Sequence, residues 1–266
     1  CELHAIVLLD LAAERPAHDE LDGICASTEY LVRPIGQQKV LGSIEPHAAR
    51  EFRIPDLAWL IHRQIYTQRI DVLQLEYTVL GQYAGQFRHI PSILFEHDVY
   101  FQSIARRLPF MPSLSEKLEA CWEYLRSLRW ELGMLPKLDR IQVCSRENGA
   151  YLESFLPRLR GRIDDGFRAG IDTGRYEFRP GGGTGREPFT LLFLGSFRHT
   201  PNREALTWFV ERVLPRVLAQ EPSARVMVVG SEPPARDSFR HGGAVELVGF
   251  VEDVREPLAR YSLFLC

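Results

Sequence analysis

The stretch LLFLGSFRHTPNREALTWFVERVLPRVLAQEPSARVMVVG, residues 191–230, decides the fold of the chain. An apolar run ends at Gly195, and after a loop an amphipathic pattern over 201–219 leads to a second apolar run that ends at Gly230. This order of strand, loop, helix and strand is typical of a βαβ unit with a parallel sheet. Ligands of such sheets bind beyond the carboxyl ends of the strands, so the two glycines mark a candidate binding edge.

The unit continues with a third apolar run, Val245–Val248, which again ends at a glycine, Gly249. Three such glycines in successive strands line one edge, where backbone approaches a ligand closely. The loop GSFRHTPN then opens a helix whose N-terminal amides favour an anion such as a diphosphate. We expect Thr200 to be the N-cap of this helix, with Pro201 in its first position, and Pro215 to kink it.

The first half of the chain repeats the alternation of apolar runs and helical patterns. Strands are expected over 4–9, 30–33, 72–75, 92–95 and 141–144. A long helix is predicted over Leu114–Leu132, and its apolar stripe is expected to face the core. The stripe consists of Leu118, Cys121, Trp122, Leu125, Leu128 and Leu132. The opposite face, with Lys117, Arg126 and Arg129, is expected to be solvated.

A change in composition divides the chain. The segment RPGGGTGREP, residues 179–188, holds four glycines and two prolines and has no apolar periodicity, as a linker does. Its glycines precede a strand, whereas a phosphate-binding loop follows one. We therefore expect an α/β protein with a domain over 1–180, a linker over 181–188 and a second, incomplete domain over 189–266.

Composition excludes several classes of protein. The 266 residues are 45% hydrophobic and 25% charged, as in a globular protein, and no apolar run approaches the roughly 20 residues of a membrane helix. A net charge of -3 argues against nucleic acid as a partner. The five cysteines have neither CxxC nor metal-ligand spacing, which favours reduced thiols and a cytoplasmic location. The chain starts and stops inside apolar runs, which we interpret as an excerpt of a longer protein.

The stretch 191–234, followed by VELVGFVEDVREPLARYSLFLC over 245–266, resembles the carboxyl-terminal domain of the large retaining glycosyltransferase family 4, the group 1 glycosyl transferases. The first domain is similar to the same family in the segments 71–100, 139–152 and 169–176, in the same order. The resemblance implies the GT-B fold, in which two Rossmann-like domains with parallel sheets hold the active site between them.

The resemblance also implies roles for single residues. His97 matches the catalytic histidine that contacts the donor sugar, and Gly195 matches the glycine beside the donor diphosphate. Gly230, Val251 and Glu252 would lie near the nucleotide base. On this reading His97 and Gly195 face each other across one cleft.

Two carboxylates near His97 are left with open roles. Glu76 ends another strand, LQLEY, and either faces the cleft or orients a neighbour. Asp98 follows His97 directly and is either a cleft residue or a turn residue.

The chain departs from the family pattern at three points. An Arg and a Lys that neutralise the diphosphate are replaced by Ser196 and Asn202, so Arg198 or Arg203 would have to supply the charge. Arg168 and Ala169 stand where the family has Pro-Asn. The paired glutamates and the glycine-rich acceptor loop of the family would lie after Cys266 and before Cys1.

These observations predict a retaining glycosyltransferase that moves a sugar from a nucleotide-diphosphate donor to a carbohydrate or lipid-linked acceptor. No metal or other cofactor is expected, and peripheral contact with the inner face of a membrane is an open expectation. One alternative is an isomerase like the nucleotide-sugar 2-epimerases, which would need an acid and a base on the sugar ring. The other is a non-catalytic module that binds sugars or nucleotides.

Overall fold

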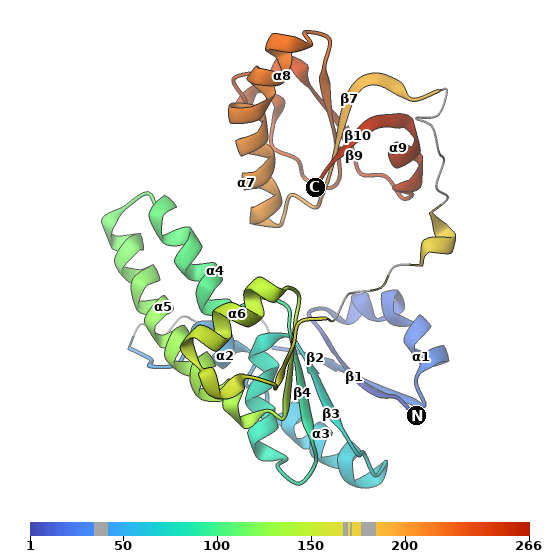
Figure 1. Ribbon diagram of the computed structural model, residues 1–266. Helices are drawn as coiled ribbons and strands as arrows, with labels where there is room; N and C mark the ends of the chain where they lie inside the picture. Colours follow the sequence, from blue (N-terminus) through green and yellow to red (C-terminus); the bar gives the residue numbers. More distant parts are fainter. Residues whose placement is uncertain (35–41, 167–169, 171, 177–184) are drawn as a thin grey trace. The chain divides into compact units, whose positions relative to one another are not determined.

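The computed structural model in Figure 1 describes residues 1–34, 42–166, 170, 172–176 and 185–266. The chain forms two compact units, Cys1–Ala169 and Gly170–Cys266. Half of the predicted linker, residues 181–184, and the Arg168-Ala169 departure lie outside the described residues. The strand β7 already begins at Glu187, so the last two positions of the predicted linker and Phe189 belong to the second sheet.

The first unit contains two parallel sheets. A four-stranded sheet has the order β3-β4-β5-β6, and β1 pairs with β2 in a separate two-stranded sheet. All five predicted strands form, and the short β6 adds to them. The strands are β1 (His4–Leu9), β2 (Ser27–Val32), β3 (Leu73–Glu76), β4 (Ser92–Glu96), β5 (Arg140–Val143) and β6 (Ile163–Asp164).

One hydrophobic core joins the two sheets of this unit. Leu94 and Ile141 of the central strands are fully buried in it, and Ile6, Leu8 and Leu31 of the smaller sheet pack against the same cluster. The helices that surround it are η1 (Ala12–His18), α1 (Glu20–Ile24), α2 (His47–Glu51), α3 (Pro55–Thr67), η2 (Thr78–Gln86), α4 (Tyr100–Arg107), η3 (Leu108–Phe110), α5 (Leu114–Met134), η4 (Leu135–Lys137), α6 (Arg146–Phe155) and η5 (Pro157–Leu159).

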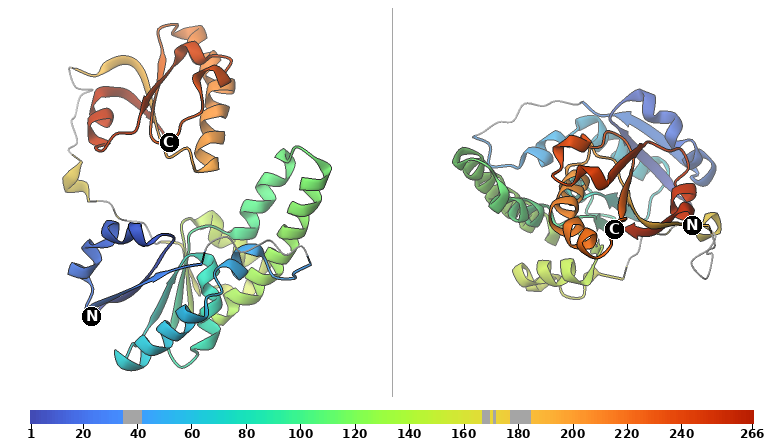
Figure 2. Two further views of the ribbon diagram at one scale, coloured as in Figure 1. Left: turned by 180° about the vertical axis from the view of Figure 1, so that it is seen from behind. Right: turned by 90° about the horizontal axis from the view of Figure 1, so that it is seen from above.

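The long helix α5 forms where it was expected, but the prediction for its buried face is wrong. Figures 1 and 2 show α4 and α5 side by side, running away from the sheet, so the first turns of α5 have no sheet to pack on. The side chains of Leu118, Trp122 and Leu125 are 64%, 43% and 54% exposed, and Cys121 is exposed as well. Only Leu128 and Leu132, near the body of the unit, pack against the core.

The opposite face of α5 also differs from the prediction at one position. Arg126 was expected in solvent but is only 8% exposed. Its guanidinium pairs with Glu123 one turn away and donates a hydrogen bond of 3.2 Å to the carbonyl oxygen of Ser43. Burial of this arginine is tolerated because its charge and donors are satisfied. Lys117 and Arg129 are exposed, as predicted.

The second unit is a four-stranded parallel sheet in the order β10-β7-β8-β9. Leu191, Val226 and Val228 pack in one cluster, whereas Leu192 and Met227 pack in another, so alternate residues bury both faces. Its strands are β7 (Glu187–Leu194), β8 (Arg225–Val229), β9 (Val245–Gly249) and β10 (Tyr261–Leu265). Its helices are η6 (Thr173–Arg175), α7 (Thr200–Trp208), the π-helix η7 (Phe209–Val213), α8 (Leu214–Gln220), η8 (Arg236–Ser238), η9 (Gly242–Ala244) and α9 (Arg255–Arg260).

The helix after β7 differs from the prediction at its N-cap and shows the predicted irregularity at Pro215. Thr200 is the first residue of α7 instead of its N-cap, and the preceding His199 is extended and makes no side-chain cap. Pro215 lies in the first turn of α8, directly after the π-helix η7. Because proline has no N–H to donate, the turn before it widens, which is how the predicted irregularity at Pro215 appears.

Candidate functional site

The three glycines of the second unit meet at the carboxyl ends of β7, β8 and β9. The amide of Gly195 donates to the carbonyl of Val229 at 3.0 Å, and the amide of Gly230 donates to the carbonyl of Gly249 at 2.8 Å. Gly230 has a φ of +144°, and a Cβ built on it would lie 1.7 Å from the carbonyl oxygen of Gly195. Only glycine fits at this position, because the ends of β7 and β8 approach each other closely there.

Ser196 and Asn202 lie next to this edge. The amide side chain of Asn202 donates to the carbonyl of Ser196 at 3.0 Å and closes the loop between β7 and α7. The hydroxyl of Ser196 lies 3.2 Å from the hydroxyl of Ser231, which directly follows Gly230. Sequence reasoning missed Ser231, although its position after a strand-end glycine was a signal. Two exposed hydroxyls therefore stand together at the glycine edge.

The cations proposed for diphosphate binding are both engaged in the structure. Arg198 donates from Nε to the carboxylate of Glu232 at 2.6 Å, and both side chains are largely exposed. Arg203 donates to the carbonyl of Phe197 at 2.9 Å and so supports the loop. In the first turn of α7, Pro201 has no amide, and the amides of Asn202 and Arg203 already donate to His199. The expected anion site at this helix terminus is therefore weaker than the sequence suggested.

Val251 and Glu252, which were expected near the nucleotide base together with Gly230, differ in their surroundings. Val251 packs against the buried cluster of Leu192 and Met227, so it is a core contact. Glu252 is exposed and lines a cavity of about 270 Å³. The other lining residues are Arg175, Tyr176, Asp253, Val254 and Arg255.

In the first unit, His97 stands at the carboxyl end of β4, beside the end of β3. Its Nε2 lies 3.2 Å from a carboxylate oxygen of Glu76, and its ring centroid lies 4.2 Å from that of Phe95. The side chain is 46% exposed. The amide of Gln74 donates to Glu76 in turn. The contact with His97 fits the orienting role left open for Glu76.

Asp98 follows His97 and is exposed. Its carbonyl accepts a hydrogen bond of 3.0 Å from the hydroxyl of Thr78, which ties the loop after β4 to the loop after β3. Tyr77, between Glu76 and Thr78, has a φ of +86°, a strained conformation for a residue other than glycine. Strain of this kind gathers at functional sites, and here it lies directly after Glu76, the last residue of β3.

A pair of buried carboxyls lies at the carboxyl end of β4 in the first unit. Glu96, the residue before His97, and Glu131 of α5 are both 0% exposed. Glu131 accepts hydrogen bonds of 3.1 Å from the backbone amides of Tyr100 and Phe101, at the start of α4. Among the described residues, no N–H or hydroxyl donates to the Glu96 oxygens. Two such carboxyls can remain together only if they share a proton.

The environment of the pair accounts for its ionisation. Burial, and after it the neighbouring charge of Glu131, raises the pKa of Glu96 well above its ordinary value. Burial raises the pKa of Glu131 to about 7, although its hydrogen bonds with Glu96, Phe101 and Tyr100 act in the opposite direction. Sequence reasoning read Glu96 only as the end of a strand and missed this pair.

Two absences in the described part of the chain bear on the type of site. No group of three or more His, Cys, Asp and Glu side chains is gathered there as metal ligands would be. No helix of that part has the length and apolar character that crossing a bilayer requires.

Residues 188–266 match the family model described as Glycosyl transferases group 1. This segment is therefore similar to the group 1 glycosyl transferases. It contains the whole glycine edge, together with Ser196, Arg198 and Asn202. No curated protein matches the sequence.

Solved structures show the fold of the chain as a whole. Sucrose-phosphate synthase from Thermosynechococcus elongatus is similar with a TM-score of 0.55 at 14% identity, over 97% of this chain and 72% of that one. A UDP-glucosyltransferase from Polygonum tinctorium is similar with a TM-score of 0.52 at 12% identity, over 99% of this chain and 75% of that one. The fold is GT-B, as predicted, and the match of residues 188–266 supports a glycosyltransferase.

Proposed function

We propose that the protein transfers a sugar from a nucleotide-diphosphate donor to a carbohydrate or lipid-linked acceptor, with retention at the anomeric carbon. The observation that carries the proposal is the glycine edge formed by Gly195 and Gly230 inside the segment that matches the group 1 family model. The amides of both glycines already donate to backbone carbonyls, so a diphosphate would bind the hydroxyls of Ser196 and Ser231 beside them.

In this proposal, Arg198 supplies the charge that the leaving diphosphate needs. Its present partner, Glu232, is exposed, so exchanging the carboxylate for a phosphate costs little desolvation. A guanidinium binds phosphate oxygens with two parallel hydrogen bonds, which compensates for the missing Arg and Lys of the family pattern. Gly230 and Glu252 would lie near the nucleotide base, and Val251 would support them from the core.

His97 would contact the donor sugar, held by Glu76. The reaction needs little covalent help from the protein, so most of the rate comes from positioning and from stabilising developing charge. The carboxylate of Glu76, 3.2 Å from Nε2, would hold the ring of His97 in place. No metal enters this scheme.

The acceptor side of the proposal rests on a group of exposed apolar side chains at the far end of the α4–α5 hairpin. Phe110, Leu114 and Leu118 are 84%, 74% and 64% exposed, and Arg106 and Arg107 end α4 beside them. Apolar side chains with adjacent cations are the composition of a surface that binds an anionic membrane. Such contact would place the protein at the inner face of a membrane, where a lipid-linked acceptor is found.

The function is tested by incubating the protein with UDP-, GDP- and ADP-sugars and following release of the nucleotide diphosphate. NMR of the anomeric proton in the product then shows retention or inversion. An epimer formed from the donor alone would favour the isomerase, and tight donor binding without turnover would favour the non-catalytic module. Inversion would refute the retaining mechanism.

Substitution of His97 by Ala should lower turnover about a hundredfold or more, because a polar contact that strengthens in the transition state is lost. The melting temperature should change little, since the half-exposed side chain has little packing to lose. His89→Ala is the matched control, because His89 is also exposed but precedes β4 at the opposite end of the strand. Normal turnover with a lower melting temperature in His97→Ala would make this histidine structural.

A further inference from the structure

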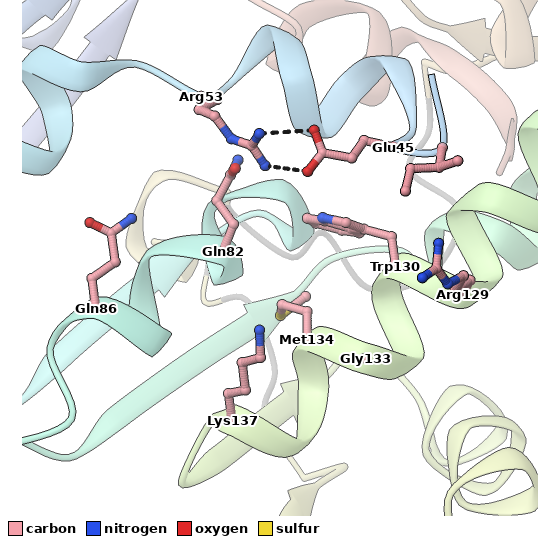
Figure 3. A pocket seen from close by; sticks show the side chains of 10 residues that line it. Glu45, Arg53, Gln82, Gln86, Arg129, Trp130, Gly133, Met134 and Lys137 are labelled. Atoms are coloured by element: carbon pink, nitrogen blue, oxygen red, sulfur yellow. Dashed lines mark hydrogen bonds and ion pairs between the residues drawn. The ribbon is translucent and has the colours of Figure 1, made fainter. Parts of the chain in front are cut away.

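A cavity of about 450 Å³ lies in the first unit, and its lining includes neither His97 nor Glu76 (Figure 3). It is formed by the segment before α3, by η2 and by the end of α5 with η4. Its volume is within the range of sites for small molecules. The lining residues are Ile44, Glu45, Arg53, Gln82, Gln86, Arg129, Trp130, Gly133, Met134 and Lys137.

The charged groups of the cavity leave an excess of positive charge. Arg53 donates to both carboxylate oxygens of Glu45, at 2.7 and 2.8 Å, so these two charges cancel. Arg129 and Lys137 are exposed, and no described residue forms an ion pair or a hydrogen bond with either side chain. Figure 3 shows the ammonium group of Lys137 extending toward Met134 and Gln82. The two remaining cations favour a ligand with an anionic group.

Two amide side chains give the cavity neutral polar groups. Gln82 donates from Nε2 to the carbonyls of Ala49 and Val79, at 3.0 and 2.9 Å, which fixes the side chain and leaves its oxygen as an acceptor. Gln86, one turn further along η2, is exposed and keeps both an acceptor and donors. Such rigid acceptors and mixed donors suit the hydroxyl groups of a sugar.

The apolar part of the cavity is the indole of Trp130, with Met134 beneath it. Trp130 is half-buried, and Figure 3 shows its ring between the Arg53–Glu45 pair and Met134. Met134 is 3% exposed and is held against η2, where a Cβ on Gly81 would lie 2.5 Å from its sulfur. A flat aromatic face on a rigid support stacks well against the apolar face of a pyranose ring.

We propose that this cavity binds a saccharide residue that carries an acidic group, either a carboxylate or a phosphate. The ring stacks on Trp130, the hydroxyls bind Gln82 and Gln86, and Lys137 and Arg129 hold the anion. None of these residues belongs to the donor edge or to the His97 pair. The site is thus a second carbohydrate site, and it stands independently of the transfer reaction.

The proposal is tested by calorimetric titration of the full chain with glucuronic acid, glucose 6-phosphate, glucose and inorganic phosphate, at low salt and without nucleotide sugar. Glucuronic acid and glucose 6-phosphate should bind, with dissociation constants of about a millimolar or below, and glucose and phosphate alone should bind at least about tenfold more weakly. If one of the two acidic sugars binds more tightly, the tighter ligand shows whether the site prefers a carboxylate or a phosphate. Added salt should weaken both.

Variants locate the site. Lys137→Gln together with Arg129→Gln should lower the affinity for the acidic sugar at least about tenfold and leave the weak binding of glucose unchanged. Lys117→Gln removes an exposed cation of the same helix outside the cavity and should have no effect. Far-ultraviolet circular dichroism identifies any variant that fails to fold, in which case Gln86→Ala replaces it.

Three results would overturn the proposal. Equal binding of phosphate and glucose 6-phosphate would show a simple anion site, and equal binding of glucose and glucuronic acid would show that the cations are not used. The titration should reach tens of millimolar acidic sugar, which is roughly the weak limit for specific recognition. Absence of binding at that concentration would show that the cavity holds no sugar. Since no donor or turnover is involved, these results do not depend on the proposed transferase activity.

Discussion

Replacement of Glu96 by Gln should make the stability of the first unit much less dependent on pH. In the wild type, the pKa of Glu131 rises from an ordinary 4.5 to about 7, because the carboxyl is buried. A group whose pKa is raised by folding contributes its stability below the unfolded value and loses it as pH rises through the folded value. From Glu131 alone the free energy of unfolding should fall by about 3 kcal/mol between pH 4.5 and pH 8, at ~1.4 kcal/mol per pH unit, and the raised pKa of Glu96 adds to this fall.

The Glu96→Gln substitution changes this balance because the new amide donates to Glu131 without a titratable proton. Glu131 is then stabilised as a carboxylate, as it already is by the amides of Tyr100 and Phe101. The loss of stability above pH 5 should shrink to about 1 kcal/mol or less. Glu131→Gln should also flatten the profile, but at a lower stability throughout, because Tyr100 and Phe101 donate to different oxygens of Glu131 and the NH2 group that replaces one of them cannot accept.

The measurement is urea unfolding between pH 5 and pH 8, followed by tryptophan fluorescence, which reports the neighbouring Trp130. Hydrogen exchange of the Phe101 amide gives a local readout, since this amide donates directly to Glu131. Glu119→Gln, an exposed carboxylate of the same helix, is the control and should keep the wild-type profile. A wild-type urea midpoint that stays constant over this range would show that the two carboxyls share no proton and would refute the reasoning.

The remaining predictions concern the glycine edge, the His97 pair and the apolar stripe. Gly230→Ala should destabilise the second unit by about 3 kcal/mol or more, because the new Cβ would meet a backbone carbonyl oxygen at 1.7 Å and the φ is positive. A melting temperature equal to that of the wild type would contradict this. Glu76→Gln should lower kcat about tenfold with little change in the donor KM or in melting temperature, and steady-state kinetics that show only a KM effect would contradict the orienting role. Leu118→Ser should reduce cosedimentation with anionic vesicles but not thermal stability, since the side chain is 64% exposed; unchanged vesicle binding, or dimers that dissociate in the variant, would point to a second copy as the occupant of the stripe.

Much of the fold follows from local patterns. The apolar runs at 92–95, 191–194 and 225–229 predict buried parallel strands, because a strand covered on both faces needs an uninterrupted apolar sequence. The positions of Gly195, Gly230 and Gly249 after successive strands also predict one common edge, since parallel strands end on the same side of a sheet. These features depend on neighbours along the chain, and the sequence alone therefore determines them.

Other features were decided only by tertiary structure. The periodicity of α5 predicts an amphipathic helix but not which face is buried, and its apolar stripe is exposed because the helix extends past the sheet. The Glu96–Glu131 pair, the contact of Glu76 with His97 and the pairing of Arg198 with Glu232 join residues more than twenty positions apart. Such contacts depend on which elements pack together, and periodicity carries no information on that. The sequence by itself determined the strands and the glycine edge of the second unit, whereas the packing of distant elements decided the protonation of Glu96 and Glu131 and the contacts of His97 and Arg198.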